Sequence, residues 1–415
     1  MKKIIVVFVN NSMAELDWIL PVLHRLSKNY KIFTYFRNQA SYDSLKQNII
    51  LFKLWKKINS FFYIERYFHR LLFKIIKKIN GFFKFNNLEI YLNNKIANLN
   101  IIKKIISDKI HSNKYKLKII FSDFGENFLF LHLYKDVKKD RPFIVHYPHT
   151  PIASEKNNKK KHKVNLVGDL LLLGRKEDIS SFSDAINKKK IKPVGIPRFD
   201  KWWIDKNFLS YKNNLDIHYS LKELKKNFII TIAYDSKFAV KRFKNKTELF
   251  KKQLEDLMDT ISKIPNAIII FKVHPRRNSK EFHNILNKYD KSIWKVSKMH
   301  LLQLASLSNC FICHPTSAAG YEALNFKVPL IKIWPITGVD PEKDLNEKLG
   351  FVKSARNKNE LLKFIKLSKD KENILWKKQQ KNFRSNYPNL GNSSSKVIKV
   401  IKEAQKILNN QKELR

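Results

Sequence analysis

Short, largely apolar runs alternate with segments of helical spacing at the start of the chain. Residues 4–9 and 31–36 are apolar and short enough to form buried strands. Between them, residues 14–27 carry apolar side chains at every third or fourth position, as one face of a helix does. A strand, a helix and a second strand in this order are typical of a doubly wound α/β domain, which we predict here.

The same alternation returns in the second half of the chain. We predict strands at residues 228–233, 267–273, 310–313 and 328–334, with helices at 247–264 and 299–308 between them. A β-α-β crossover of this kind places ligands at the carboxyl ends of parallel strands. Further helices are predicted at residues 359–367, 372–383 and 393–408.

Residues 51–84 combine a strong helical spacing with a strong charge. Apolar and aromatic residues repeat every three to four positions, and nine basic residues against Glu65 alone give the stretch a charge of +8. A basic amphipathic helix rich in Phe and Trp is typical of proteins that lie on an anionic membrane. The same pattern is typical of core helices with a solvated basic face. No nucleic-acid-binding module matches it, so we expect no nucleic-acid partner.

Titratable side chains follow two consecutive strands predicted in the first half, at residues 117–121 and 142–145. Asp123 and Glu126 come after the first of these strands, and His146 and His149 come after the second. The carboxyl ends of neighbouring parallel strands meet at one edge of a sheet, where a catalytic cleft is built. Each of the four residues also suits a turn or a helix cap, and residues 10–12 form a weaker candidate loop at the same edge.

A second polar group follows the predicted strand at residues 267–273. The strand ends abruptly in His274 and a proline, and Arg276 and Arg277 come directly after them. Three such side chains at the rim of a sheet suit a phosphate-bearing ligand. The simpler interpretation is that His274 and the proline only end the strand.

A third group follows the strand at residues 310–313. Thr316, Ser317 and Gly320 are small residues that open a helix, and Glu322 lies further along the same helix. With Thr316 or Ser317 as N-cap, backbone N–H groups would be uncrowded at the positive end of the helix dipole, a geometry that receives a phosphate. Glu322 would then accept hydrogen bonds from ribose hydroxyls. The simpler interpretation is that Thr316 is only an N-cap.

Length and composition set further bounds. At 415 residues the chain is too long for one ordinary core, so we expect two domains. Its 82 Lys and Arg against 36 Asp and Glu give a net charge of +46, which favours anionic partners. Lysine is spread over most of the chain, however, and a biased base composition of the genome would also produce such a distribution. No apolar run reaches the roughly 18 residues of a membrane-spanning helix, and residues 1–10 fit a first strand better than a signal peptide.

Cys310 and Cys313 are the two cysteines of the chain. Three positions apart in one predicted strand, they point to opposite faces, so we expect neither a redox motif nor a zinc site. Two cysteines give no disulfide framework, and a reducing cytoplasm is the expected location.

Two segments of the second half resemble the GT-B superfamily. They are Lys272-Val-His-Pro-Arg and Ser317-Ala-Ala-Gly-Tyr-Glu-Ala-Leu-Asn-Phe-Lys-Val-Pro-Leu-Ile. Within the superfamily they are most similar to bacterial surface-polysaccharide transferases, CDP-glycerol glycerophosphotransferases and UDP-N-acetylglucosamine 2-epimerase relatives. Gly195-Ile-Pro-Arg-Phe-Asp is similar to the Gly-x-Pro-Arg-x-Asp segment of the glycerophosphotransferases. The resemblance covers mainly residues 190–335.

The resemblance implies two Rossmann-like doubly wound α/β domains that face a cleft, the GT-B type. Residues 1–200 would bind the acceptor and carry a basic helical insertion at about 51–110. A linker at 201–226 would lead to a nucleotide-donor domain at 227–390, and a C-terminal helix at 391–415 would pack back across the first domain.

The resemblance also implies roles for the candidate residues. His146 or His149 would deprotonate the acceptor hydroxyl, with Asp123 and Glu126 in reserve, while Arg198 would approach a phosphate or pair with Asp200. The donor would be held by the residues named above, namely His274, Arg276, Arg277, Thr316, Ser317, Gly320 and Glu322. GT-B enzymes generally need no metal, no Asp-x-Asp motif is present, and no cofactor is expected.

The expected activity is transfer of a sugar or a polyol phosphate from a nucleotide-activated donor to a growing cell-surface polysaccharide. The enzyme would work in the cytoplasm, on the inner face of the membrane if residues 51–84 bind an anionic lipid surface or if the acceptor is lipid-linked. Three alternatives stay open: a CDP-glycerol transferase, a UDP-N-acetylglucosamine 2-epimerase-like isomerase, and a non-enzymatic membrane-surface protein. His314-Pro-Thr-Ser stands where the glycerophosphotransferases usually have an Asp-Tyr-Ser-Ser-like turn, which argues against the first.

Overall fold

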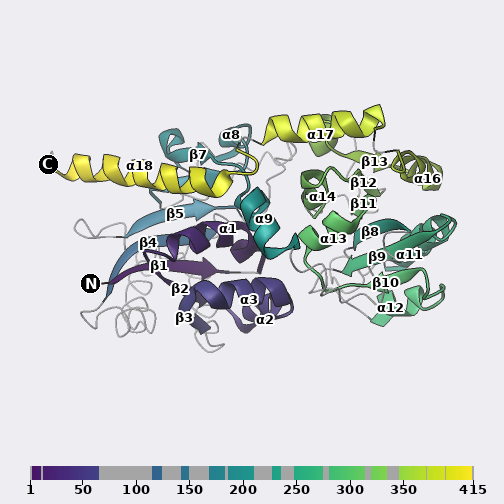
Figure 1. Cartoon of the computed structure of the whole chain (residues 1–415), viewed down its shortest axis with the longest axis horizontal. Coiled ribbons are helices and arrows are strands. Elements are labelled where there is room, and N and C mark those ends of the chain that lie inside the picture. The colour runs from purple at the N-terminus through teal and green to yellow at the C-terminus, as the bar shows by residue number, and fades with distance from the viewer. Residues whose placement is uncertain are drawn as a thin grey trace, which may run out of the picture.

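The computed structural model describes thirteen segments of the chain. They are residues 2–10, 13–64, 115–123, 142–148, 168–182, 186–209, 227–234, 247–273, 280–313, 319–333, 345–370, 372–387 and 389–413. These segments form two α/β domains that lie side by side (Figure 1).

The first domain is built on a parallel sheet of seven strands in the order β3-β2-β1-β4-β5-β6-β7. Its central strands are almost entirely buried, which is why they are continuous apolar runs without alternation. The elements are β1 (Lys2–Val9), α1 (Met13–Leu26), β2 (Lys31–Phe36), α2 (Gln39–Lys46), α3 (Ile49–Ile58), β3 (Asn59–Ile64), β4 (Tyr115–Asp123), β5 (Phe143–Tyr147), β6 (Leu170–Leu173), α8 (Ile179–Phe182), η1 (Lys188–Lys190), β7 (Ile191–Pro193), η2 (Pro197–Phe199) and α9 (Lys201–Asn207).

The second domain is built on a parallel sheet of six strands in the order β10-β9-β8-β11-β12-β13. The strands and helices predicted from apolar periodicity all reappear in it, with ends shifted by a few residues. The elements are β8 (Phe228–Tyr234), α11 (Thr247–Ile261), β9 (Ala267–Val273), α12 (Lys280–Leu286), β10 (Trp294–Val296), α13 (Leu301–Leu307), β11 (Cys310–Cys313), α14 (Tyr321–Asn325), β12 (Leu330–Ile333), α15 (Leu345–Lys348), β13 (Lys353–Ala355), α16 (Lys358–Leu367), α17 (Ile374–Asn386) and α18 (Ser393–Glu413).

Each sheet has one point where the strand order reverses. In the first sheet it lies between β1 and β4, and in the second between β8 and β11. In doubly wound sheets the connections on either side of such a point leave in opposite directions, which opens a crevice at the carboxyl ends of the two strands. The fold therefore offers one ligand-binding edge in each domain, as the predicted GT-B type requires.

One apolar core runs through both domains. It joins residues of β1 and α1, such as Val7 and Leu20, to residues of β11 and α14, such as Phe311 and Tyr321. The opposite face of the second sheet has a separate core against α11, α12 and α16. A shared core of this kind fixes the two domains against each other more firmly than a polar contact would.

Helix α18 returns from the second domain and lies along the first (Figure 1). Its first turn is capped by Asp200, whose carboxylate accepts from the backbone N–H of Ser393 at 2.5 Å and of Ser394 at 2.8 Å. The Ser394 hydroxyl also donates to Asp200. The cap of α18 is thus supplied by a residue almost 200 positions earlier, which ties this helix to the segment after η2.

The helix predicted over residues 51–84 is wrong at residues 59–64. After α3 the chain forms β3, which pairs with β2 in parallel. The Asn59 side chain accepts from the Thr34 hydroxyl at 2.7 Å, and exposure alternates along the start of β3. Neighbouring β2 supplies the hydrogen bonds that make this short aromatic run a strand, a tertiary effect that helical spacing cannot show. Residues 65–114 lie outside the described residues.

The first residues of the predicted linker at 201–226 are helical. Residues 201–207 form α9, and Trp203 and Ile204 of this helix are buried in the core that spans both domains. The charged residues of α9, which are Lys201, Asp205 and Lys206, are exposed on its outer face. Residues 210–226 lie outside the described residues.

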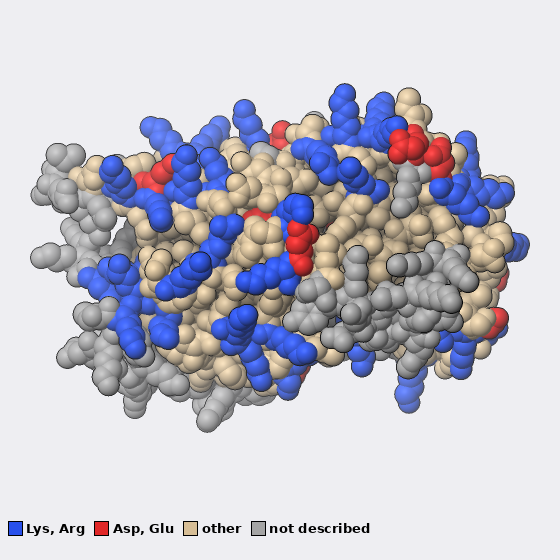
Figure 2. All heavy atoms as spheres, viewed as in Figure 1, with Lys and Arg blue, Asp and Glu red and all other residues tan. Residues whose placement is uncertain are grey.

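Basic residues are spread over both domains on the face shown in Figure 2, with few acidic ones between them. This distribution fits the even spread of lysine along the sequence. In the described part of the chain, no helix is long and apolar enough to span a bilayer.

Candidate functional site

The carboxyl edges of the two sheets meet at a buried group of charged side chains. Asp17 stands near the start of α1, the helix that follows β1. Glu322 lies in α14, the helix that follows β11, and His300 is the N-cap of α13. Arg198, in η2 between the two domains, joins them: its guanidinium lies 3.2 Å from Oδ2 of Asp17 and 2.8 Å from Oε1 of Glu322.

These four side chains are almost completely withdrawn from solvent, each at most 7% exposed. Burial alone would raise the pKa of Asp17, but His300 and Arg198 outweigh burial and hold that pKa below its usual value. For Glu322 burial prevails over the attraction of Arg198, so its pKa is raised. Arg198 is held charged, because Glu322 and Asp17 raise its pKa against the effect of burial. We call these four residues the interdomain charge cluster.

The tautomer of His300 follows from its two contacts. Its Nδ1 accepts the backbone N–H of Leu302 at 3.1 Å, which is the helix-capping contact of α13. The hydrogen of a neutral imidazole must then sit on Nε2, which lies 3.3 Å from Oδ1 of Asp17. His300 therefore presents an N–H to Asp17 while it caps α13, and this contact binds the first domain to the second.

A second polar group lies at the strand-order reversal of the first sheet. Asn10 directly follows β1 and is fully buried; its backbone N–H donates to Glu15 at 2.6 Å. Its backbone oxygen accepts from Asn38 and Ser41 at the start of α2. With these bonds the main chain is fixed, yet neither polar atom of the Asn10 side chain has a partner among the described residues.

Tyr147 belongs to this group from β5, the strand next to β4. Its ring stacks on Trp18 of α1 at 5.5 Å between centroids and is fully buried. Burial raises the pKa of Tyr147 far above its usual value, and the nearby charges of Glu15 and Asp123 raise it further. The hydroxyl is thus kept neutral as a donor, and it has no partner among the described residues.

The structure brings together some of the residues predicted from sequence and separates others. Arg198 and Glu322, both predicted for the donor, form the ion pair above. The predicted pairing of Arg198 with Asp200 is wrong, since Asp200 caps α18. Asp123 ends β4 at the order reversal, as expected. His146 was expected after a strand, but it is the penultimate residue of β5, fully buried, and it packs so closely on Gly168 that a Cβ there would stand 2.5 Å from its ring.

The start that we predicted for the helix after β11 is also wrong. We expected Thr316 or Ser317 as N-cap, but α14 begins at Tyr321, and Gly320 holds the N-cap position without a side-chain bond. Gly320 is small because it packs on Leu330, which a Cβ would meet at 2.3 Å. The predicted residues Glu126, His149, His274, Arg276, Arg277, Thr316 and Ser317 lie outside the described residues.

Sequence reasoning missed Asp17, His300, Glu15 and Tyr147. Asp17 and Glu15 fall on the apolar face of a helix, where acidic residues are rarely buried without a partner, and this is a signal that could have been used. His300 precedes a helix with Gln303 three positions later, the spacing of a capping box. Nothing in the sequence around Tyr147 distinguishes it from an ordinary core tyrosine.

The two cysteines point to opposite faces of β11, as predicted. Cys310 belongs to the core of the second domain, whereas Cys313 belongs to the core that spans both domains. Burial raises the pKa of the Cys310 thiol to about 12, so it is not a reactive thiolate. Among the residues that the structure describes, no three His, Cys, Asp or Glu side chains are grouped as metal ligands.

Comparisons with solved structures show the fold. UDP-bound MnaA of S. aureus superposes with a TM-score of 0.58 at 14% identity, covering 97% of this chain and 96% of that one. UDP-GlcNAc 2-epimerase from Neisseria meningitidis, bound to UDP-GlcNAc, gives 0.57 at 13% identity, covering 97% and 100%. A glycosyltransferase from Rickettsia africae gives 0.54 at 14% identity, covering 98% and 99%.

Comparisons of the sequence found nothing: no family model matches this chain. No curated protein matches it either. The structural likeness extends over nearly the whole chain, while the identities are low. The chain thus has the GT-B fold, with two Rossmann-like domains whose carboxyl edges face each other.

Proposed function

We propose that this GT-B chain transfers a sugar, or a polyol phosphate, from a nucleotide-activated donor to a growing cell-surface polysaccharide. The fold supports a nucleotide-sugar enzyme, because the structures it resembles include one with UDP and one with UDP-GlcNAc. The glycosyltransferases among them support group transfer, and the motifs at residues 272–276 and 195–200 support the surface-polysaccharide branch.

One observation carries the proposal. Buried side chains on both facing edges keep polar atoms without a partner among the described residues: the amide of Asn10 and the hydroxyl of Tyr147 in the first domain, and Oε2 of Glu322 in the second. Buried polar atoms are nearly always hydrogen-bonded, so a cluster of exceptions at the strand-order reversals points to a hydroxyl-rich ligand. A sugar with its nucleotide ribose is such a ligand.

The donor phosphates need positive charge that the interdomain charge cluster does not supply. Arg198 is shared by Asp17 and Glu322, so its charge is already compensated. His274, Arg276 and Arg277 follow β9, next to β8 in the second sheet, and we assign them the phosphates. Fixed cationic donors there would stabilise the departing phosphate without a metal ion.

The acceptor hydroxyl needs a base at the edge of the first sheet. Asp123 is better placed than His146, because it ends β4 at the order reversal, while His146 is packed against Gly168 within the sheet. Tyr147, kept neutral by burial and by the charges of Glu15 and Asp123, would donate to an acceptor or sugar oxygen beside that base. Glu126 and His149 stay candidates for the same role.

A binding screen tests the donor assignment. The purified protein is heated with UDP, CMP, CDP, GDP, dTDP and their activated sugars or glycerol, and a ligand at 100 times its Kd should stabilise it by about 2.7 kcal/mol. We expect a shift with one nucleotide that is lost in His274→Ala and kept in His283→Ala, a histidine of α12. No shift with any of them would contradict the proposal.

A turnover assay separates transferase from epimerase. With the nucleotide sugar found in the screen, a transferase releases the nucleotide only when an acceptor glycan is added, and Asp123→Asn should lower that rate at least 100-fold while nucleotide binding remains. Inversion of the donor sugar without any acceptor would overturn transfer in favour of the isomerase. A product that carries glycerol phosphate would instead select the CDP-glycerol transferase.

A further inference from the structure

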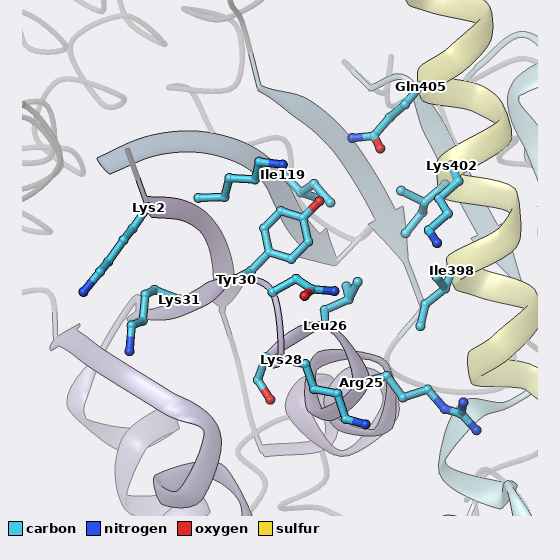
Figure 3. Close-up of a pocket in the computed structure, with 14 residues that line it drawn as sticks. Lys2, Arg25, Leu26, Lys28, Tyr30, Lys31, Ile119, Ile398, Lys402 and Gln405 are labelled. Carbon is cyan, nitrogen blue, oxygen red and sulfur yellow. The ribbon is translucent and has the colours of Figure 1, made fainter. Parts of the chain in front are cut away.

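A cavity of about 760 Å³ lies at the opposite edge of the first domain from the interdomain charge cluster. It is formed where β1 and β2 begin, at the C-terminal end of α1, and by the face of α18 that crosses them (Figure 3). Its volume falls within the range of small-molecule sites. Because it lies at the amino edge of the sheet, it cannot share a ligand with the carboxyl edge.

The rim of this cavity is basic. Six of its lining side chains are cationic, and none is acidic: Lys2, Lys3, Arg25, Lys28, Lys31 and Lys402. Arg25 stacks over the Trp202 ring at 4.5 Å and is thereby fixed. None of the five lysines has a carboxylate within 4 Å among the described residues, in contrast to Lys201, Lys251 and Lys288 elsewhere on the surface. Within the described part of the chain, no carboxylate at ion-pair distance therefore compensates these lysines.

The floor of the cavity is apolar. Tyr30 lies in the middle, with Ile119 on one side and Leu26 on the other, and Gln405 points toward them from α18 (Figure 3). Ile398 and Ile401 complete the floor from the same helix, and Ile398 and Tyr30 are only half-buried. An apolar floor below a rim of cationic side chains suits a ligand that has an apolar body and an anionic group.

We propose that this cavity binds a phosphate-bearing amphiphile, with the phosphate on the lysine rim and the apolar part on Tyr30, Ile398 and Ile401. The rim alone would suit a free phosphate or pyrophosphate. The half-buried apolar floor favours an amphiphile, because a small inorganic anion would leave the apolar side chains of the floor exposed to water. The proposal does not depend on the activity assigned to the carboxyl edges.

Calorimetric titration with monomeric short-chain lipids tests the proposal. The probes are dihexanoyl phosphatidic acid, dihexanoyl phosphatidylcholine and inorganic pyrophosphate at one ionic strength. We expect phosphatidic acid to bind at least 10-fold more tightly than either of the other two. Lys31→Glu with Lys402→Glu should weaken it at least 10-fold, because the two lysines stand on different elements of the rim.

The matched control is Lys291→Glu with Lys363→Glu, two exposed lysines of the second domain that change the net charge equally. It should stay within 2-fold of the unaltered protein. A second variant, Ile398→Ser, tests the floor: it should weaken phosphatidic acid about 5-fold and leave pyrophosphate unchanged. Equal binding of phosphatidylcholine or pyrophosphate, equal loss in the control pair, or no binding of phosphatidic acid would each overturn the proposal.

Discussion

The first domain holds cationic side chains at both edges of its sheet, in two opposite ways. At the carboxyl edge Arg198 is buried and shared by Asp17 and Glu322. At the amino edge Lys31 and Lys402 stand exposed around a cavity without an acidic lining residue. A buried cation must be compensated for the chain to fold, whereas a hydrated one costs little and stays available to a ligand. Position in the fold thus decides which charge serves stability and which serves binding.

Removing the shared cation should have the largest effect. In Arg198→Met the two carboxylates Asp17 and Glu322 are left buried without their counter-ion, so we expect the unfolding free energy in urea to fall by about 3–5 kcal/mol. The control is Lys291→Met, which removes an exposed cation and should change it by less than about 0.5 kcal/mol. If the unfolding free energy of Arg198→Met fell as little as that of the control, the proposed difference between the two edges would be wrong.

Asp17 should make the charge cluster sensitive to acid. Its pKa in the folded protein is lowered, so the folded state binds this proton less readily than the unfolded state does. Its stabilising contribution is thus complete above its unfolded pKa of about 3.8 and is lost as the pH falls through the lower folded value. At pH 7 we expect Asp17→Asn to be less stable by about 1.5–3 kcal/mol, with the gap closing toward pH 3. A gap that widens in acid would contradict the assigned sign.

The cap on α18 should matter less than the cluster. Asp200→Ala removes the acceptor of Ser393 and Ser394 N–H groups, and we expect a loss of about 1–2 kcal/mol in urea unfolding. Asp205→Ala, which removes an exposed carboxylate of α9 that pairs with Lys201, is the matched control and should be nearly neutral. Equal losses in both variants would mean that Asp200 does not hold the helix in place.

The smallest effect on stability is expected at the basic cavity. Lys31→Glu with Lys402→Glu should change the unfolding free energy by less than about 0.5 kcal/mol, because neither lysine has an ion-pair partner among the described residues. This double variant therefore distinguishes a role in binding from a role in folding, since it should lose most of its affinity for phosphatidic acid while it stays folded. A large destabilisation would show that these lysines belong to the fold.

The central strands of both sheets could be predicted from sequence because parallel strands buried on both faces are continuous apolar runs. The short edge strands β10 and β13 of the second sheet were not predicted. The segment after Ile58 could not be predicted, because only pairing with β2 makes residues 59–64 a strand. The end of α18 is similar: a periodic pattern predicts the helix, but the cap from Asp200 needs the folded chain. The local sequence pattern was therefore enough to predict an element whose burial determines its structure. It was not enough where contact with a residue distant in the sequence determines the structure.

The site was predictable to a smaller extent. Arg198 and Glu322 were found through motifs, but their mutual ion pair joins residues more than 120 positions apart and cannot be inferred from either motif. Asp17 and Tyr147 carry no motif and become notable only because β1, β4 and β5 are adjacent in the sheet. Candidate chemistry was visible in the sequence where a motif carried it, as at Arg198 and Glu322, and partners across the domain interface were not visible.

Hydrogen exchange read by mass spectrometry tests the central claim, that the two edges of the first domain serve different ligands. With the nucleotide that shifts the melting temperature, we predict protection of residues 13–18 and 319–325 at the facing carboxyl edges. With dihexanoyl phosphatidic acid, we predict protection of residues 25–31 and 398–405 at the cavity, and no change at the carboxyl edges. Protection of one common set of residues by both ligands, or of neither set, would contradict the account.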